Sequence, residues 1–405
     1  MHLLLRLTFL LASTCLLLPA ARADRRADPS KPFEAIVVPT IQYANRDFYD
    51  HTAENGAPNF QGVNRLFPGQ RLMIVVLAGN FSVDTSGRAD VVYDLDIAYP
   101  GGKTEKAGRN LTLCTGLVPD VHLMPYARQI ASFSTDPGDP TGDYGFTVTA
   151  RDRTAGTTSR KTVVVRVEPL AEPALPADFQ PDRWMASYYQ HPAPAEALPA
   201  LFKFAAGLPK DNADAWPPIL GFYEAVLTDN PWLAPVFLER LKSADDTSRT
   251  LLLFVLGYAW RHETAAGANL PAPLAEALAK ARHNNWPEVD TGELQDPRQL
   301  DVLWGRFFAT GAFAPIARIT SAFALHRSLG ALDKFKANPP ASGQPTPEMM
   351  QELVLKSAQW SLGANARRHP LVRHYAEWIL AHPQGDTMAN ILLATALGQE
   401  SAPAH

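Results

Sequence analysis

Histidine pairs are the first residues whose types and spacing could bind a metal ion. His262 is followed by Glu263, but no second histidine stands four residues on, where a helix would place two ligands on one face. His369 and His374 are five residues apart, so a helix would turn them towards different faces. The spacing favours structural roles, and we expect neither a bound metal nor another cofactor. Motifs for phosphate binding or for a nucleophilic serine are also absent from the sequence.

The most suggestive polar residues lie in one stretch near the C-terminus. Trp360, Asn365, Arg367, Arg368 and His369 bring together an aromatic ring, an amide, two guanidinium groups and an imidazole. Two interpretations remain open. Asn365 and Arg368 could cap helix ends while His369 bonds a neighbouring carbonyl group. Alternatively, the residues could form a polar pocket beside Trp360 that attracts an anion.

This stretch resembles a signature of uncharacterised bacterial exported or envelope proteins. From Trp360 to Val372 the chain reads Trp-Ser-Leu-Gly-Ala-Asn-Ala-Arg-Arg-His-Pro-Leu-Val. A second part of the signature, from Leu303 to Gly311, reads Leu-Trp-Gly-Arg-Phe-Phe-Ala-Thr-Gly. The resemblance implies a helical region of unknown function and carries no catalytic or binding residues with it.

Carboxylates gather at two places in the N-terminal half of the chain. The loop from Asp136 to Asp143 is rich in Asp, Pro and Gly, which suit a turn and would also suit calcium. The spacing does not match an EF-hand, so we favour the turn. Asp94 and Asp96 share one face of a predicted strand and could do acid–base chemistry. Their alternation with apolar residues favours an ordinary solvated sheet face.

Residues 1–23 have the features of a secretory signal peptide. A short basic start precedes an apolar run from Leu7 to Leu18, and the segment ends in Ala-Arg-Ala. We predict cleavage after Ala23 and export to the periplasm or the medium. A lipoprotein signal at Cys15 is disfavoured, because the apolar run continues beyond it. Cys114 would then be the only cysteine of the mature chain, and its strand-like surroundings favour a buried thiol.

The next region has the two-residue period of β-strands. Large apolar side chains alternate with polar or small ones from Val91 to Tyr99 and from Tyr144 to Ala150, with turn residues between the runs. The segment from Asp143 to Asp152 resembles the late strands of immunoglobulin-like domains on bacterial exported proteins. We expect an all-β, immunoglobulin-like sandwich over residues 33–168, and a proline-rich linker over residues 169–181.

Residues 182–400 have the 3.6-residue period of helices. Asp296 and Thr346 each precede a proline and predict helix starts, whereas Gly311 predicts a helix end. The run from Leu251 to Trp260 is apolar on nearly all sides, which predicts a central helix. The short connections favour an all-α domain of stacked helical hairpins, similar to an α-solenoid. All eight tryptophans lie here, and we expect most of them in the core.

Composition limits the classes of function. With 37 basic and 41 acidic residues the net charge is −4, so the chain lacks the basic excess of a nucleic-acid-binding protein. No apolar run reaches the roughly 18 residues that cross a bilayer. We therefore expect a non-enzymatic binding or scaffold protein of the bacterial envelope, whose helical domain contacts a protein or peptide. An envelope hydrolase with a site formed only in three dimensions, or a passive structural component, remains the alternative.

Overall fold

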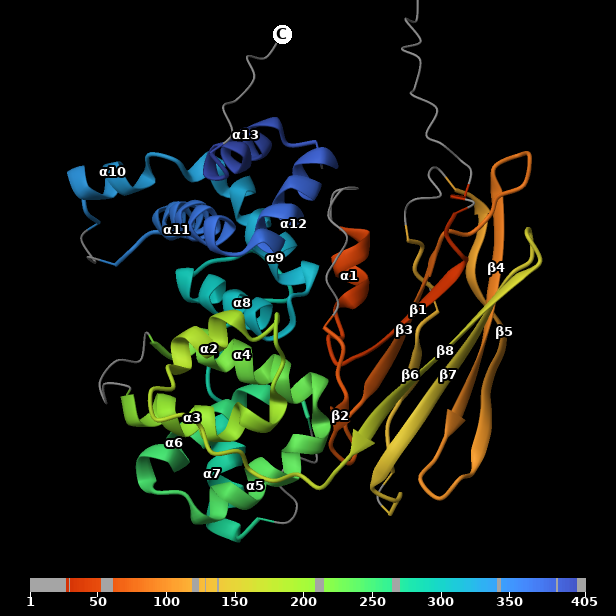
Figure 1. Ribbon diagram of the computed structural model, residues 1–405. Helices are drawn as coiled ribbons and strands as arrows, with labels where there is room; N and C mark the ends of the chain where they lie inside the picture. Colours follow the sequence, from red (N-terminus) through yellow and green to blue (C-terminus); the bar gives the residue numbers. More distant parts are fainter. Residues whose placement is uncertain are drawn as a thin grey trace, which may run out of the picture.

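The computed structural model describes residues 27–28, 30–51, 61–118, 124–127, 129–136, 138–207, 215–263, 270–340, 344–383 and 385–398. The strands lie in the N-terminal part of the chain and most helices follow them, so the protein has a mixed α and β fold (Figure 1). The predicted signal peptide, including Cys15 and the cleavage site at Ala23, lies outside the described residues.

Two sheets form the strand region, on the right of Figure 1. The smaller sheet is antiparallel and has the order β1-β3-β6. The larger sheet has the order β2-β8-β7-β4-β5, in which β2 is parallel to β8 and the other neighbours are antiparallel. The strands are β1 Glu34–Thr40, β2 Arg65–Leu66, β3 Leu72–Gly79, β4 Arg88–Ala98, β5 Thr104–Leu117, β6 Ala131–Phe133, β7 Gly142–Asp152 and β8 Thr157–Val167.

The predicted alternation along the strands is confirmed by burial. Tyr144, Phe146 and Val148 on β7 are fully buried. They belong to the same hydrophobic cluster as Ile74 and Val76 of β3, so the two sheets share one core. Because side chains alternate across a strand, the intervening residues of β7 lie on the opposite face of the larger sheet. An immunoglobulin-like strand topology stays a prediction.

The remainder of the described chain is helical, on the left of Figure 1. No helix among the described residues combines the length and the apolar character that a membrane span needs. The helices are α2 Pro181–Ser187, α3 Ala197–Gly207, α4 Trp216–Asp229, α5 Ala234–Ser243, α6 Asp246–Ala259, α7 Ala272–Arg282, α8 Pro297–Thr310, α9 Phe313–Ser321, α10 Ala331–Ala337, α11 Pro347–Arg368, α12 Pro370–Ala381 and α13 Thr387–Ala396, with 3₁₀ turns at η1 Pro194–Glu196, η3 Pro231–Leu233 and η4 Ala322–Ser328.

Helix ends follow the predicted capping residues. The carboxylate of Asp296 accepts a hydrogen bond from the Arg298 backbone N–H, and Gln299 completes a capping box at the start of α8. At the start of α11 the hydroxyl group of Thr346 accepts a hydrogen bond of 3.2 Å from the Met349 backbone N–H. Gly311 adopts φ 65° and ends α8, a conformation that glycine enters at little cost. Local sequence therefore determines where these helices begin and end.

Two glycines allow α4 and α8 to pack closely at the centre of the helical region. A Cβ atom at Gly305 would collide with the carbonyl group of Pro218, and one at Gly221 would collide with the carbonyl group of Val302. The two helices therefore approach each other more closely than larger side chains would permit. This contact fixes the relative positions of the residues that α4 and α8 contribute to the site described below.

One short helix joins the strand region to the helical region. α1 (Asn45–Asp50) lies between the two in Figure 1. Phe48 is part of the hydrophobic cluster of the helical region. The Asp47 carboxylate accepts a hydrogen bond of 2.9 Å from the Phe313 backbone N–H at the start of α9. Gln42 donates a hydrogen bond of 2.9 Å to the Tyr189 carbonyl group. The two regions thus share an interface that the sequence pattern did not predict.

Candidate functional site

The polar stretch from Trp360 to His369 does not converge on one pocket around Trp360. Trp360 lies on α11 with 77% of its surface exposed, whereas His369 follows α11 and is 8% exposed. Nine residues of helix separate them by about 13 Å along the axis. Arg367 and Arg368 are exposed, and Asn365 is half-buried one turn before His369. The structural interpretation of this stretch is favoured over the anion pocket.

His369 is packed among aromatic rings between α11 and α12. Its Nδ1 atom lies 3.3 Å from the hydroxyl oxygen of Tyr189, and its ring contacts those of Phe307 and Phe308. Burial lowers the pKa of His369, and the nearby charge of Arg368 acts in the same direction. A neutral imidazole in this position joins the helices, and it would attract an anion poorly.

The other candidate residues for metal chemistry are dispersed or already bonded. Among the described residues, no group of three or more His, Cys, Asp and Glu side chains could hold a metal ion. In the acidic loop, Asp139 accepts a hydrogen bond of 2.8 Å from the Asp136 backbone N–H, as in a turn. Asp143 pairs with Arg166 at 2.7 Å. Two of the carboxylates considered for calcium therefore have protein partners.

Asp94 and Asp96 lie on the solvent side of β4 and are paired with arginines. Asp94 accepts two hydrogen bonds from Arg151, at 2.7 and 2.8 Å. Asp96 pairs with Arg109. The hydrogen bonds from Arg151 lower the pKa of Asp94 to about 2. Cys114 on β5 is half-buried, and burial raises the pKa of its thiol, which reduces its reactivity.

A large cleft opens in the helical region among α4, α6, α8 and the segment before α8. We call it the aromatic cleft, and its volume is about 1080 Å³. Ligand pockets typically occupy roughly 300–1,000 Å³. Its lining comprises Trp216, Pro217, Leu220, Thr250, Phe254, Asn285, Trp286, Pro287, Glu288, Thr291, Gly292, Glu293, Gln295, Asp296, Arg298 and Gln299.

Three aromatic rings form one side of the aromatic cleft. The ring centroids of Trp216 and Phe254 are 4.7 Å apart, and those of Phe254 and Trp286 are 5.8 Å apart, both edge to face. The indole N–H of Trp286 donates a hydrogen bond of 2.9 Å to the Ala281 carbonyl group, which orients this ring. All three residues are half-buried, so part of each ring is available to a ligand. Such rings offer large apolar contacts at a low cost in conformational entropy.

Carboxylates line the cleft near these rings. Asp296 pairs with Arg298 at 2.5 Å. Glu288 accepts a hydrogen bond of 2.8 Å from the Asp290 backbone N–H, and Glu293 accepts one of 2.9 Å from the side chain of Gln351. Within the described part of the chain, neither glutamate forms an ion pair with a basic side chain. The lining therefore carries two glutamates that form no ion pair with a described basic residue.

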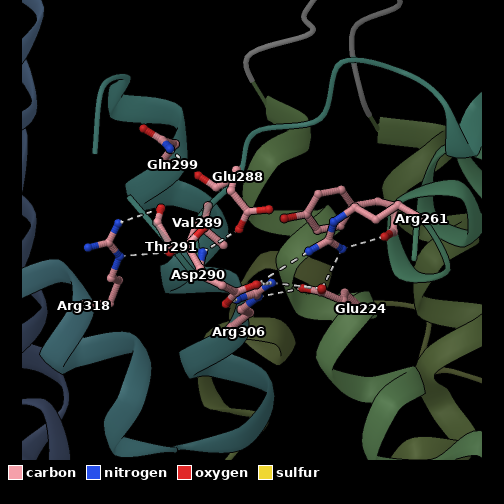
Figure 2. Close-up of polar contacts among 10 residues, drawn as sticks. Glu224, Arg261, Glu288, Val289, Asp290, Thr291, Gln299, Arg306 and Arg318 are labelled. Carbon is pink, nitrogen blue, oxygen red and sulfur yellow. Dashed lines mark hydrogen bonds and ion pairs between the residues drawn. The ribbon is translucent and has the colours of Figure 1, made fainter. Parts of the chain in front are cut away.

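The segment that carries both glutamates is held in place by side chains of neighbouring helices. We call residues 283–296 the cleft loop, and Figure 2 shows its contacts. Arg306 on α8 donates hydrogen bonds of 2.5 and 3.2 Å to the Asp290 carboxylate. Arg318 on α9 donates to the carbonyl groups of Val289, at 2.9 Å, and Gly292, at 2.5 Å. The loop has little regular structure of its own, so these contacts determine its path.

A buried ionic cluster anchors the loop at its centre. Glu224 on α4 accepts hydrogen bonds from Arg261, at 2.7 Å, and Arg306, at 2.6 Å (Figure 2). The exposed fractions of these side chains are 13% for Glu224, 7% for Arg261 and 15% for Arg306. With Asp290, the cluster contains two acids and two bases. Burial opposes the charge of Arg306, but the hydrogen bonds that it donates to Asp290 and Glu224 outweigh this effect and raise its pKa.

The ionic cluster also supports the aromatic side of the cleft. The guanidinium group of Arg261 lies 4.1 Å from the ring centroid of Tyr258. Tyr258 in turn packs edge to face against Trp286, with centroids 5.4 Å apart. The ionic cluster therefore contacts the cleft loop through Asp290 and supports the aromatic side through Tyr258.

The charged residues among the described lining residues are Glu288, Glu293, Asp296 and Arg298. Histidine, cysteine and lysine are absent from the lining as far as the structure describes it. The hydroxyl group of Thr250 donates a hydrogen bond of 2.8 Å to the Asp246 carbonyl group and is not paired with a base. None of the five residues of the predicted polar stretch lines the cleft.

Sequence reasoning missed this site because its parts come from separate segments. The sequence predicted most tryptophans in the core without distinguishing among them, and Trp216 and Trp286 pack against the core while they also line the cleft. One local signal was present. Residues 283–296 contain a tryptophan and four acidic residues without helical or strand periodicity, between two predicted helices. The signature segment Leu303–Gly311 does contribute, since it contains Arg306.

Comparison with known proteins shows no family for this chain. No family model and no curated protein match it. A family 123 glycoside hydrolase from Clostridium perfringens, solved in a study of glycolipid glycan hydrolysis, is 14% identical over 46% of this chain, with a TM-score of 0.19. A solved protein described as pT26-6p is 11% identical over 85% of this chain, with a TM-score of 0.18. The matches span 36% and 49% of those two structures, and such scores do not indicate a shared fold.

Proposed function

We propose that this protein is an exported binding protein of the bacterial envelope. Its helical domain, proposed to be a stack of hairpins, holds a peptide segment of a partner protein in the aromatic cleft. The strand region, proposed to be an immunoglobulin-like sandwich, serves as a spacer or docking module. The observation that carries the proposal is the row of Trp216, Phe254 and Trp286 beside a polar rim in a cleft of about 1080 Å³.

The fixed cleft loop supports a preformed binding site. Arg306 and Arg318 bond the loop to α8 and α9, and Arg261 links the ionic cluster to the aromatic side. A ligand that enters a site of this kind does not have to order the loop first, so less of the interaction energy is lost as entropy. Half-buried aromatic residues at the centre of a cleft are also the residues that contribute most to affinity in peptide and protein complexes.

A randomised heptapeptide library displayed on phage tests the proposal with the full mature chain as the target. Peptides enriched by the wild-type protein are synthesised, and their dissociation constants are measured by isothermal titration calorimetry. We expect Trp216→Ala to weaken binding by at least 10-fold, because removal of a central aromatic side chain from an interface commonly costs about 2 kcal/mol.

Trp360→Ala provides the matched control. Trp360 is the most exposed large hydrophobic residue among the described residues of the helical region, and it is not among the described residues that line the cleft. We expect this variant to bind the same peptides with unchanged affinity. Circular dichroism melting curves establish that both variants fold. A library that yields no binding peptide, or peptides that respond to Trp360→Ala and not to Trp216→Ala, would contradict the proposed function.

A further inference from the structure

Several carboxylates elsewhere on the protein surface pair with arginine. Asp94 pairs with Arg151, and Asp143 pairs with Arg166. Asp290, directly beside the aromatic cleft, pairs with Arg306 at 2.5 Å. Glu288 and Glu293 differ, since each accepts one hydrogen bond from a neutral group and has no cationic partner among the described residues.

Arg298, the basic residue among the described lining residues, bonds another carboxylate of the lining. Arg298 donates three side-chain hydrogen bonds to Asp296, at 2.5 to 3.1 Å. The Asp296 carboxylate also accepts the backbone N–H of Arg298 at the start of α8. Arg298 is thus paired with Asp296, and among the described lining residues Glu288 and Glu293 are the carboxylates without an ion pair.

The aromatic side of the cleft complements the same kind of ligand. The faces of tryptophan and phenylalanine rings carry partial negative charge and attract cations. The side chains of lysine and arginine have an apolar stem that packs on such rings and a charged head that stays near water or a carboxylate. A single lysine or arginine side chain could therefore place its apolar stem on Trp216 and Phe254 and its charged head beside the two glutamates.

We infer that the aromatic cleft selects a peptide segment through a lysine or arginine side chain. The stem of that side chain lies against the rings of Trp216 and Phe254, and its cationic head is bound by Glu288 and Glu293. This inference rests on the proposed function, which it makes specific. A neutral segment of similar size lacks the charge to complement the cleft, and an acidic segment is repelled.

Four heptapeptide pools of random flanking sequence test this selection. Their central residue is fixed as lysine, arginine, norleucine or glutamate, and binding to the full mature chain is measured by fluorescence polarisation at low and at high salt. We expect the lysine and arginine pools to bind at least 10-fold more tightly than the norleucine pool, and the glutamate pool to bind least. The preference should shrink at high salt, because ions screen partly exposed charges.

Variants locate the selection at the cleft. The double variant Glu288→Gln/Glu293→Gln should reduce the preference for lysine over norleucine to less than 3-fold while the norleucine pool binds as it does to wild type. Glu239→Gln is the matched control, because Glu239 is an exposed glutamate on α5 outside the cleft. This variant should retain the full preference.

The outcomes separate the two proposals. If the norleucine pool binds as tightly as the lysine pool, or if the double variant keeps the preference, the inference is wrong while the aromatic cleft can still be a peptide site. If no pool binds, the proposed function is wrong and the inference is wrong with it.

Discussion

The solvent face of the larger sheet and the aromatic cleft both carry carboxylates, but the three aspartates of the sheet named below have arginine partners, whereas two glutamates of the cleft lining form no ion pair among the described residues. On the sheet, Asp94, Asp96 and Asp143 each bond an arginine of a neighbouring strand. In the cleft, Glu288 and Glu293 bond only neutral groups. Exposure does not explain the difference, because Asp143 is 54% exposed and is paired nonetheless.

The difference follows from how each surface is built. Antiparallel strands place side chains of neighbouring strands about 5 Å apart, so an acid and a base on adjacent strands meet without further support. The cleft loop has no neighbouring strand. The arginines that contact it, Arg306 and Arg318, bond Asp290 and a main-chain carbonyl group. Carboxylates that remain without a cation beside exposed rings are a better indication of a binding site than the number of acidic residues is.

Removing the ionic cluster beneath the cleft loop should have the largest effect on stability. Arg306→Met leaves Glu224, whose side chain is 13% exposed, and Asp290, whose side chain is 55% exposed, with only Arg261 to neutralise them. We expect the free energy of unfolding, measured in urea, to fall by about 3 kcal/mol, since an unpaired buried charge commonly costs 3–5 kcal/mol. The double variant Arg306→Met/Glu224→Gln removes one orphaned charge and should recover part of the loss. If Arg306→Met lowers the free energy of unfolding by less than about 1 kcal/mol, the ionic cluster does not stabilise the fold as stated here.

Asp229 at the interface of the two regions presents a third situation, a half-buried carboxylate whose cationic partner, Arg71, lies at the long distance of 4.0 Å. Burial raises its pKa to about 6, and Arg71 at 4.0 Å offsets only part of this effect. Between pH 4 and 6 the folded state therefore still holds a proton on Asp229, whereas the unfolded state, with a pKa near 3.8, has already released it. This group lowers stability above pH 6, and the penalty disappears as the pH falls towards 4.

Asp229→Asn removes that penalty. We expect the variant to be more stable than wild type by up to about 2 kcal/mol at pH 7, and the difference to vanish by pH 4. Urea unfolding at several pH values gives the comparison. Arg71 keeps its contact with the Tyr43 ring, with 4.2 Å between guanidinium carbon and centroid, so it is not left without a partner. A stability difference that does not change between pH 4 and 7 would contradict this account.

Breaking a pair on the sheet face should have a smaller effect, with the opposite dependence on pH. The pKa of Asp94 is about 2 in the folded state, below the 3.8 of the unfolded chain, so its contribution is present above pH 4 and is lost as the pH falls towards 2. We expect Asp94→Asn to cost about 1 kcal/mol at pH 7, because solvent screens a partly exposed pair. Asp90→Asn on the same strand is the control, since Asp90 is half-exposed and lies 3.8 Å from Arg153. If both variants lose the same free energy of unfolding, the hydrogen bonds between Asp94 and Arg151 do not stabilise the fold more than the weaker contact of Asp90 does.

Local features of the fold were predictable from the sequence. The alternation from Tyr144 to Ala150 matches β7, and the capping residues Asp296, Thr346 and Gly311 lie at the ends of α8 and α11. The helix α1 was not predicted, because six residues carry too weak a periodicity and its stability comes from contacts of Asp47 and Phe48 with the helical region.

The candidate site was not predictable in the same manner. The polar stretch from Trp360 to His369 is compact in sequence, yet its ends lie apart on a helix and its histidine is enclosed by rings. The aromatic cleft combines Trp216, Phe254 and Trp286 from three segments, and nothing in the sequence near any one of them indicates the other two.

The sequence by itself determined the periodicities, the helix caps and the charge balance, because these depend on residues within a few positions of one another. It also placed Arg306 and the acids of the cleft loop in the chain without indicating that they meet. Only the tertiary structure decided which carboxylates have a cation and which do not. That outcome depends on how α4, α8 and α9 pack around the cleft loop, since an ion pair requires two charged groups to lie within a few ångströms.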